Sequence, residues 1–125
     1  MREIIFRGRR VDNGELVEGD LVHNTFDGAS RDIAIGIQEK GCYPVEVLPE
    51  TVGQFTGLED KEEKKIWEDD LVQLDGWNPA IMRVSFIEGA FCLADMDGKY
   101  LADIYYAPGE CIVLRSIHTT PELLK

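Results

Sequence analysis

The sequence predicts an all-β fold, built either as a small β-barrel in the style of an SH3 domain or as two packed β-units. Short apolar segments of strand length recur along the chain, and turn residues separate them at intervals of roughly 8–12 residues. The clearest turn is Asp12-Asn13-Gly14, because Asn-Gly supplies two residues that tolerate a positive φ. Helix signals are few, so a sandwich or barrel of short strands is the architecture that these patterns indicate.

Each expected strand is bounded by glycine, proline or a charged turn. In 80–87 the alternation places Met82, Val84 and Phe86 on one face of the strand. A minor helix is expected at the C-terminus, with Thr120 as its N-cap and Pro121 at the first helical position. The expected strands cover residues 4–6, 15–23, 33–37, 45–48, 71–74, 80–87, 90–94, 100–106 and 111–117.

The length of 125 residues favours a single domain over 1–125. An internal echo, 17–22 against 67–72, suggests two β-subunits within it, of about 1–58 and 66–125. Each copy of the echo is expected to place an acidic turn before a strand that begins Leu-Val. Two similar β-units or one turn chemistry used twice would both explain it.

Leu21 and Leu71 begin the two matching strands, and we expect both side chains to be buried. Before the second strand, the stretch 59–70 holds seven acids and three lysines. Such a charge density is typical of a solvated surface connection, and we expect this stretch to be one.

The formal net charge of −11 argues against a dedicated duplex-DNA-binding protein, which needs a basic surface to displace counterions. Four arginines nevertheless gather near the N-terminus, Arg2, Arg7, Arg9 and Arg10. They favour a solvated edge strand whose charges prevent aggregation. A phosphate site is the alternative interpretation.

The chain is expected to stay in the cytoplasm without membrane association. No apolar run approaches the roughly 20 residues that span a bilayer, and the N-terminus has no signal-peptide apolar region of about 7–15 residues. The three cysteines are odd in number and form no C-x-x-C pair, which predicts free thiols in a reducing compartment. Cys92 and Cys111 lie in apolar strands, whereas Cys42 follows a glycine and is the expected exposed thiol.

We expect no metal or cofactor and no catalytic residue. A zinc site needs about four clustered nitrogen or sulfur ligands, and His23 and His118 lie far from each other and from any cysteine pair. The run 95–98, Asp-Met-Asp-Gly, resembles the centre of a calcium loop, but the aligned outer ligand positions fall on Leu93 and Ile104. A hairpin turn explains that run. Phosphate-loop and nucleophile-elbow motifs do not occur in the sequence, so an enzyme is not expected.

The segment 51–58 is the candidate interaction site. If it is extended, Phe55 and two glycines share one face, and Gln54 and Thr56 share the other. Glycine within a strand indicates a bulge or a close approach by another chain. A bulge with Phe55 in the core is the structural interpretation. A binding groove is the functional one, with Gln54 and Thr56 as the candidate interaction residues whose polar ends point outward.

Three parts of the chain together carry a family resemblance. They are Phe6-Arg7-Gly8 with Glu18-Gly19-Asp20-Leu21-Val22, then Gln54-Phe55-Thr56-Gly57-Leu58 with Asp70-Leu71-Val72, then Ile117-His118-Thr119-Thr120-Pro121-Glu122-Leu123-Leu124. In this order and spacing they resemble the YopX family of phage and prophage proteins. The resemblance covers most of the chain and implies a phage-derived, mostly-β protein of a bacterial cytoplasm. It supplies no catalytic residue.

Two departures from the family pattern concern turns. The family usually has Asn-Gly where this chain has Glu62-Glu63, and Glu-Gly-Asp where it has Glu68-Asp69-Asp70. A glycine is lost at both places. The resemblance therefore leaves open whether a tight turn with positive φ forms at either one.

The function expected from the sequence is that of a phage-derived, non-enzymatic protein-interaction module. Its partner would be a host or phage protein, bound in part through the acidic surface. The alternative is a single-stranded nucleic-acid-binding β-barrel that uses Arg7, Arg9, Arg10 and aromatic side chains. The sequence leaves open whether the protein forms a homo-oligomer.

Overall fold

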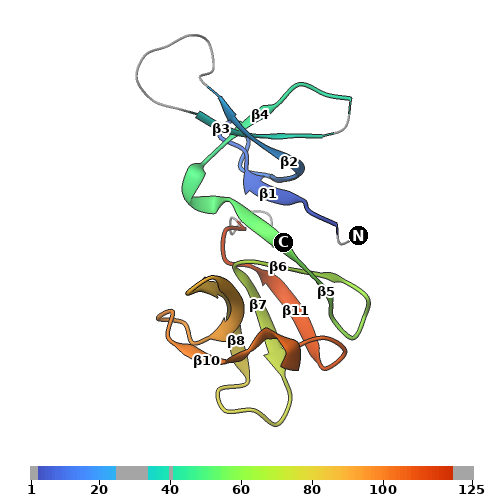
Figure 1. The fold of residues 1–125 in the computed structure, drawn as a ribbon, viewed down its shortest axis with the longest axis vertical. Coiled ribbons are helices and arrows are strands. Elements are labelled where there is room, and N and C mark those ends of the chain that lie inside the picture. Colours follow the sequence, from blue (N-terminus) through green and yellow to red (C-terminus); the bar gives the residue numbers. More distant parts are fainter. Residues whose placement is uncertain (1–2, 25–33, 40, 120–125) are drawn as a thin grey trace. The chain divides into compact units, whose positions relative to one another are not determined.

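The computed structural model describes residues 3–24, 34–39 and 41–119, and in these residues it is an all-β protein, as predicted. The chain divides into two compact units. The second unit is 55–117, and the first consists of the described residues outside that range. Figure 1 shows the strands of both units in sequence colours. The predicted C-terminal helix at Thr120 lies outside the described residues.

The first unit is an antiparallel sheet with strand order β4-β3-β2-β1. The hairpin between its first two strands turns at the predicted place: the Asn13 side-chain oxygen accepts a hydrogen bond from the Glu15 N–H at 2.9 Å, and Gly14 has a φ of 77°. The 3-10 helix η2 follows the fourth strand. The elements are β1 (Phe6–Arg9), β2 (Leu16–Asn24), β3 (Ala34–Gln38), β4 (Val45–Val47) and η2 (Pro49–Thr51).

Strand β1 is an interior strand, so the prediction of an arginine-rich edge strand is wrong. Phe6 pairs with Gly19 of β2 on one side and with Gln54, at the start of β5, on the other. The Arg7 side chain is buried rather than solvated. Because both sides of the strand are paired, its charges do not protect a free sheet edge.

A small apolar core of Val17, Ile37 and Val47 holds the first unit together. The sheet is tight enough to require glycine at two places. A Cβ on Gly8 would lie 2.8 Å from Val47 Cγ2, and one on Gly19 would lie 2.2 Å from the Gln38 carbonyl oxygen. Any larger residue at either position therefore has to displace the neighbouring strand.

The second unit contains an antiparallel sheet with strand order β10-β9-β8-β7-β11. It also contains the hairpin of β5 and β6, whose strands are not part of that sheet. The sequence predicted one strand over 100–106, but β10 ends at Asp103 and a 3-10 helix follows. The turn lets Ile104 pack against the core and buries Ala107 completely. The elements are β5 (Gly53–Glu59), β6 (Lys65–Trp67), β7 (Asp70–Leu74), β8 (Ile81–Ile87), β9 (Ala90–Ala94), β10 (Tyr100–Asp103), η3 (Ile104–Tyr106) and β11 (Cys111–Ser116).

The core of the second unit confirms the alternation predicted for β8 at two of its three positions. Met82 and Val84 are fully buried, whereas Phe86 is 52% exposed near the end of the strand. Phe86 instead makes an edge-to-face contact with Phe91 of β9, with ring centroids 5.1 Å apart. Of the two strand-start leucines, Leu71 is buried as expected, but Leu21 is only half-buried against the core of the first unit.

The charged stretch 59–70 is not a solvated connection, contrary to the prediction. It contains strand β6, whose Ile66 and Trp67 are buried, and three of its acids, Asp60, Asp69 and Asp70, are buried too. Buried carboxylates need hydrogen-bond donors. The Asp70 carboxylate, for example, accepts a 2.8 Å bond from the Trp67 N–H.

Asp60 makes the most extensive of these arrangements. Its Oδ1 accepts hydrogen bonds from the backbone N–H groups of Glu62 and Lys64, at 2.8 and 2.9 Å, and its Oδ2 accepts one from Val113 of β11 at 3.0 Å. Burial alone would raise the pKa of Asp60, but the three N–H donors and the charge of Lys64 outweigh it and lower the pKa below its ordinary value of 3.8. One ionised side chain thus fixes both the β5–β6 turn and its attachment to β11.

The same turn recurs between β9 and β10. The Asp95 Oδ1 accepts hydrogen bonds from the N–H groups two and four residues later, at 2.9 Å each, as Asp60 does. The turns cover residues 60–64 and 95–99. The fourth residue of each has a left-handed backbone, with a φ of 64° at Glu63 and 88° at Gly98. The run at 95–98 is therefore the predicted hairpin turn, and Glu63 occupies the position that glycine occupies in its counterpart.

Both turns that lack the family's glycine keep a positive φ. The second is at Asp69, whose φ is 70°. Its backbone N–H donates to the Val84 carbonyl at 2.7 Å, its carbonyl accepts from the Ile117 N–H at 3.0 Å, and its carboxylate pairs with Arg83 at 3.0 Å. These contacts offset the roughly 1–2 kcal/mol that a left-handed backbone costs a residue with a Cβ.

The two halves of the sequence echo have different structures. Residues 17–22 lie within the single strand β2, whereas 67–72 contain the end of β6, a turn and the start of β7. The acidic turn expected before Leu21 does not form. The shared letters therefore do not mark a shared local fold.

Replacing Asp60 should destabilise the protein strongly. Asp60→Asn keeps the side-chain size but removes the charge and turns an amide N–H₂ toward at least one backbone N–H, at an expected cost of about 3 kcal/mol in the free energy of unfolding. Asp95→Asn is the matched control, because Asp95 makes the same turn without the third bond to a neighbouring strand, and it should cost about 1 kcal/mol. Equal losses in urea unfolding would show that the bond to Val113 contributes nothing.

The pH dependence of stability should follow the lowered pKa of Asp60. The stabilisation by the ionised carboxylate is fully present above the unfolded-state value of 3.8 and is lost as the pH falls through the lower folded-state pKa. Unfolding curves measured between about pH 5 and pH 2 should fall more steeply for the wild type than for Asp60→Asn. Parallel curves would contradict an ionised Asp60 in the folded state.

Glu63→Gly should stabilise the protein by about 0.5–1 kcal/mol, because glycine adopts the left-handed backbone without the cost that a Cβ imposes. Glu62→Gly is the control, since Glu62 is exposed in the same turn but is not among the described residues with positive φ. That change should lower the free energy of unfolding. A loss of stability in both variants would show that Glu63 is not strained.

Candidate functional site

The candidate interaction residues Gln54 and Thr56 are both half-buried on β5. The Thr56 hydroxyl donates a 2.7 Å hydrogen bond to the Ile66 carbonyl and accepts a 3.2 Å bond from the Leu58 N–H. The Thr56 hydroxyl is therefore bonded to the local backbone. The sequence had suggested instead that it points outward. Gln54, in the first unit, pairs with Phe6 of β1.

The structural interpretation of the same segment is confirmed. The pairing of β5 with β6 shifts register between Phe55 and Glu59, and Gly57 in that interval has a φ of 89°. Phe55 is buried, and its ring centroid lies 5.6 Å from that of Trp67. A bulge with Phe55 in the core thus accounts for the two glycines.

The N-terminal arginines do not form an exposed basic stripe in the described part of the chain. Arg7 is buried, and the Arg10 guanidinium is paired with the Asp12 carboxylate through contacts of 2.9 and 2.8 Å. Arg9 donates its backbone N–H to the Thr51 hydroxyl at 2.9 Å. Its Nε is buried and has no hydrogen-bond partner among the described residues. Arg2 lies outside them.

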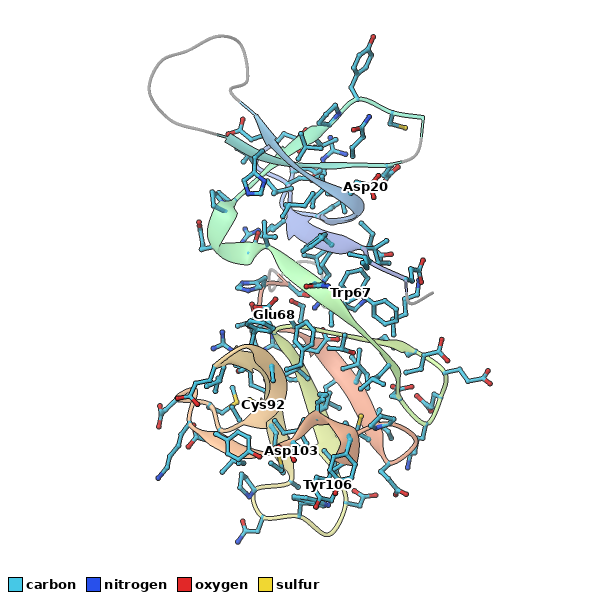
Figure 2. All side chains as sticks on the ribbon, in the orientation of Figure 1. Asp20, Trp67, Glu68, Cys92, Asp103 and Tyr106 are labelled. Atoms are coloured by element: carbon cyan, nitrogen blue, oxygen red, sulfur yellow. The ribbon has the colours of Figure 1, made fainter. Side chains whose placement is uncertain are left out.

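The cysteines have the predicted exposures. Cys42 is exposed, whereas Cys92 and Cys111 are buried in strands of the second unit. Burial, together with the nearby charge of Asp60, raises the pKa of Cys111 to about 11. Burial also raises the pKa of Cys92, which is labelled in Figure 2. Neither thiol has the depressed pKa that a nucleophile needs.

Among residues 3–24, 34–39 and 41–119, no three histidine, cysteine or acidic side chains come together in a way that could hold a metal ion. Over the same residues there is no helix with the length and apolar character needed to cross a membrane.

An aromatic cluster of Trp77, Tyr105 and Tyr106 lies on the surface of the second unit. Their side chains are 38%, 64% and 43% exposed, yet they touch one another. The rings of Tyr105 and Tyr106 stack with centroids 4.2 Å apart, and those of Trp77 and Tyr106 meet at 60° with centroids 5.5 Å apart. Figure 2 shows Tyr106 beside the loop that joins β7 and β8, which carries Trp77.

Hydrogen-bonded turns fix both loops that carry the cluster. In the β7–β8 loop, the Trp77 N–H donates to the Leu74 carbonyl at 3.3 Å. The tyrosines belong to η3, which is closed by the 2.9 Å bond from the Ala107 N–H to the Ile104 carbonyl. The Ala107 carbonyl in turn accepts bonds from Glu110 and Cys111, at 3.0 Å each, which leads the chain into β11. The aromatic rings are thus presented on anchored turns.

A cavity of about 390 Å³ opens beside the cluster. Trp77 and Tyr106 line it together with Leu74, which is buried in the core. Its other lining residues are all charged and exposed: Lys61, Asp75 and Glu110. Two carboxylates and one ammonium group leave the cavity with a local excess of negative charge. Its lining is mainly polar and charged, with two aromatic rings and one buried leucine as its apolar part.

The phenol of Tyr105 is held in its neutral form by its surroundings. The neighbouring Tyr106 side chain, with smaller contributions from desolvation and from the charge of Asp103, raises the pKa of Tyr105 above its ordinary value of 10.0. The Tyr105 ring therefore offers an uncharged face and a hydroxyl group to a ligand.

A second hollow of about 470 Å³ lies at the turn between β8 and β9. It is lined by Ile87, Glu88, Ala90 and Tyr100. The Tyr100 hydroxyl donates a hydrogen bond to Asp103 on its own strand, and this bond is the largest contribution to the raised pKa of Tyr100. The hollow has one charged group and lacks the contacting exposed rings of the aromatic cluster.

These features describe a small all-β protein of two sheet-based units, the second of which carries an aromatic-lined, acidic cavity. A family model described as YopX protein matches residues 5–125. The chain therefore belongs to the YopX family, as the sequence resemblance indicated.

The fold is also seen in a solved structure. The crystal structure of protein EF1440 from Enterococcus faecalis matches this chain with a TM-score of 0.57 and 22% sequence identity, over 100% of both chains. At this level of identity the match shows a common fold. No curated protein matches the chain.

Thiol reactivity should separate the three cysteines. In the native protein, Cys42 should react with a disulfide reagent at the rate of an exposed thiol. At pH 8 only about a thousandth of Cys111 would be thiolate, given a pKa of about 11, so it should react slowly, as should Cys92. All three should titrate after denaturation. Three fast thiols in the native protein would show that the second unit opens readily.

Proposed function

We propose that this protein is a phage-derived, non-enzymatic protein-interaction module of the bacterial cytoplasm, and that it binds a host or phage protein through the aromatic cluster of the second unit. The observation that carries the proposal is the contact among three exposed aromatic side chains, Trp77, Tyr105 and Tyr106, beside a cavity. Tryptophan and tyrosine are enriched among the residues that dominate protein–protein binding energy.

The position of the cluster on anchored turns supports this role. The three rings are held before any partner arrives, so binding does not have to order them. The buried Leu74 beneath the cavity and the charged residues around it resemble the apolar centre and polar rim of an interface. The high pKa of Cys111 and its burial support a non-enzymatic role, because they leave that thiol unsuited to nucleophilic attack.

Single-stranded nucleic-acid binding has less support. Stacked aromatic rings can receive bases, but a nucleic-acid groove also needs positive charge along the backbone path. Of the arginines proposed for that purpose, Arg7 is buried and Arg10 is paired with Asp12. The aromatic cavity has two acids and one lysine, which disfavours a phosphate chain.

A photo-crosslinking amino acid in place of Tyr105 should capture the partner in cells that carry the gene. The same amino acid in place of Tyr43, which is 91% exposed in the first unit, is the matched control and should not capture it. The captured protein is then identified by mass spectrometry and purified, so that its affinity can be measured directly.

With the purified partner, Trp77→Ala should weaken binding by about 2 kcal/mol or more, roughly 30-fold, provided that its melting curve matches the wild type. Tyr43→Ala should leave the dissociation constant unchanged. A partner captured equally from both crosslinker positions, or bound equally well by the Trp77 variant, would place the interaction elsewhere.

A further inference from the structure

We propose that the aromatic cavity of the second unit receives the guanidinium group of an arginine side chain of the partner. This inference rests on the proposed function and names the chemistry that the cavity recognises. Its three supports are the geometry of the rings, the position of two carboxylates in the lining of the cavity and the sign of the local charge.

The rings provide two faces for a planar cation. Trp77 and Tyr106 meet at 60°, so they form the corner of a cavity rather than a flat stack. A guanidinium group is planar, is less strongly hydrated than an ammonium group and stacks on aromatic faces. Tyr105, stacked on Tyr106, fixes the second wall of that corner.

Asp75 and Glu110 bring two carboxylates to the cavity from the ends of neighbouring strands. The β7–β11 ladder ends at the pair Leu74–Cys111, and Asp75 follows Leu74 in the chain as Glu110 precedes Cys111. Both acids are exposed, and both line the cavity. Two negative charges beside one cavity are complementary to a bound cation.

A guanidinium group also suits two carboxylates better than a point charge does. Its fixed fork of N–H donors can bond two acceptors at once while its face lies on a ring. The buried Leu74 lines the cavity as well and can contact the aliphatic stem of the arginine.

Lys61 is the one cationic side chain in the lining. Its backbone N–H donates to the Cys111 carbonyl at 3.1 Å, which keeps residue 61 beside the start of β11. It partly offsets the two acids and so limits affinity for a cation. The sign of its effect is therefore a test: removing Lys61 should strengthen arginine binding, whereas removing the acids should weaken it.

The test uses small probes and the full-length protein. N-acetyl-arginine amide is titrated into ¹⁵N-labelled protein while the indole N–H resonance of Trp77 is followed, and N-acetyl-citrulline amide serves as the neutral probe of the same shape. The arginine probe should shift the resonance with an affinity about fivefold or more above that of citrulline. The indole of Trp67, which is buried, is the internal control and should not move.

Variants then assign the charges. The double change Asp75→Asn/Glu110→Gln should weaken binding of the arginine probe about fivefold or more, and Lys61→Ala should strengthen it. All of these residues are exposed, and well-dispersed spectra confirm that each variant is folded.

Equal shifts with citrulline, no response to the acid changes, or equal affinity for N-acetyl-lysine amide would overturn the guanidinium assignment. A larger shift of Trp77 with oligothymidylate would overturn it in favour of nucleic acid. If crosslinking at position 105 captures a protein partner while the arginine probe does not bind, this inference fails and the proposed function stands.

Discussion

The second unit depends on one buried, ionised carboxylate. Asp60 satisfies two N–H groups of its own turn and one of β11, which is distant in the sequence. Without it, the buried N–H of Val113 and two partly buried N–H groups of the turn would lose their acceptor. The strand that follows Glu110 and the turn that carries Lys61 both take their positions from this link, since Asp60 bonds Val113 and Lys61 bonds Cys111. The charged side of the cavity is therefore built on the same contact.

One type of aspartate-centred turn occurs twice in this unit, but the sequence echo does not mark its two positions. The true pair is the turn after Asp60 and the turn after Asp95, in which an aspartate bonds the N–H groups two and four residues ahead. Their only common letters are the aspartate and the final lysine. In contrast, the two segments of the Leu-Val echo differ in structure: one lies in the interior of β2, and the other contains the turn between β6 and β7. Backbone conformation, rather than residue identity, defines the repeat.

The strands and most turns could be predicted because alternation and Asn-Gly or Asp-Gly pairs are local signals. The burial of Asp60, Asp69 and Asp70 could not, because an acidic run is normally solvated and its donors lie on strands distant in the sequence. The aromatic cluster was missed for a similar reason. Trp77 sits in a predicted turn and Tyr106 at the end of a predicted strand, and nothing in their spacing indicates that β7 and β11 bring their loops together.

The link from Asp60 to Val113 also bears on how the protein is made. The two residues are 53 positions apart, so during synthesis the Asp60 side chain emerges from the ribosome long before its third donor exists. Until then the turn after Asp60 can form its two local bonds, but its link to β11 cannot form. In the first unit the apolar core of Val17, Ile37 and Val47 and the β1–β4 strands lie early in the sequence and meet no such delay. We therefore expect the nascent chain to carry an ordered N-terminal part while the remainder waits for β11.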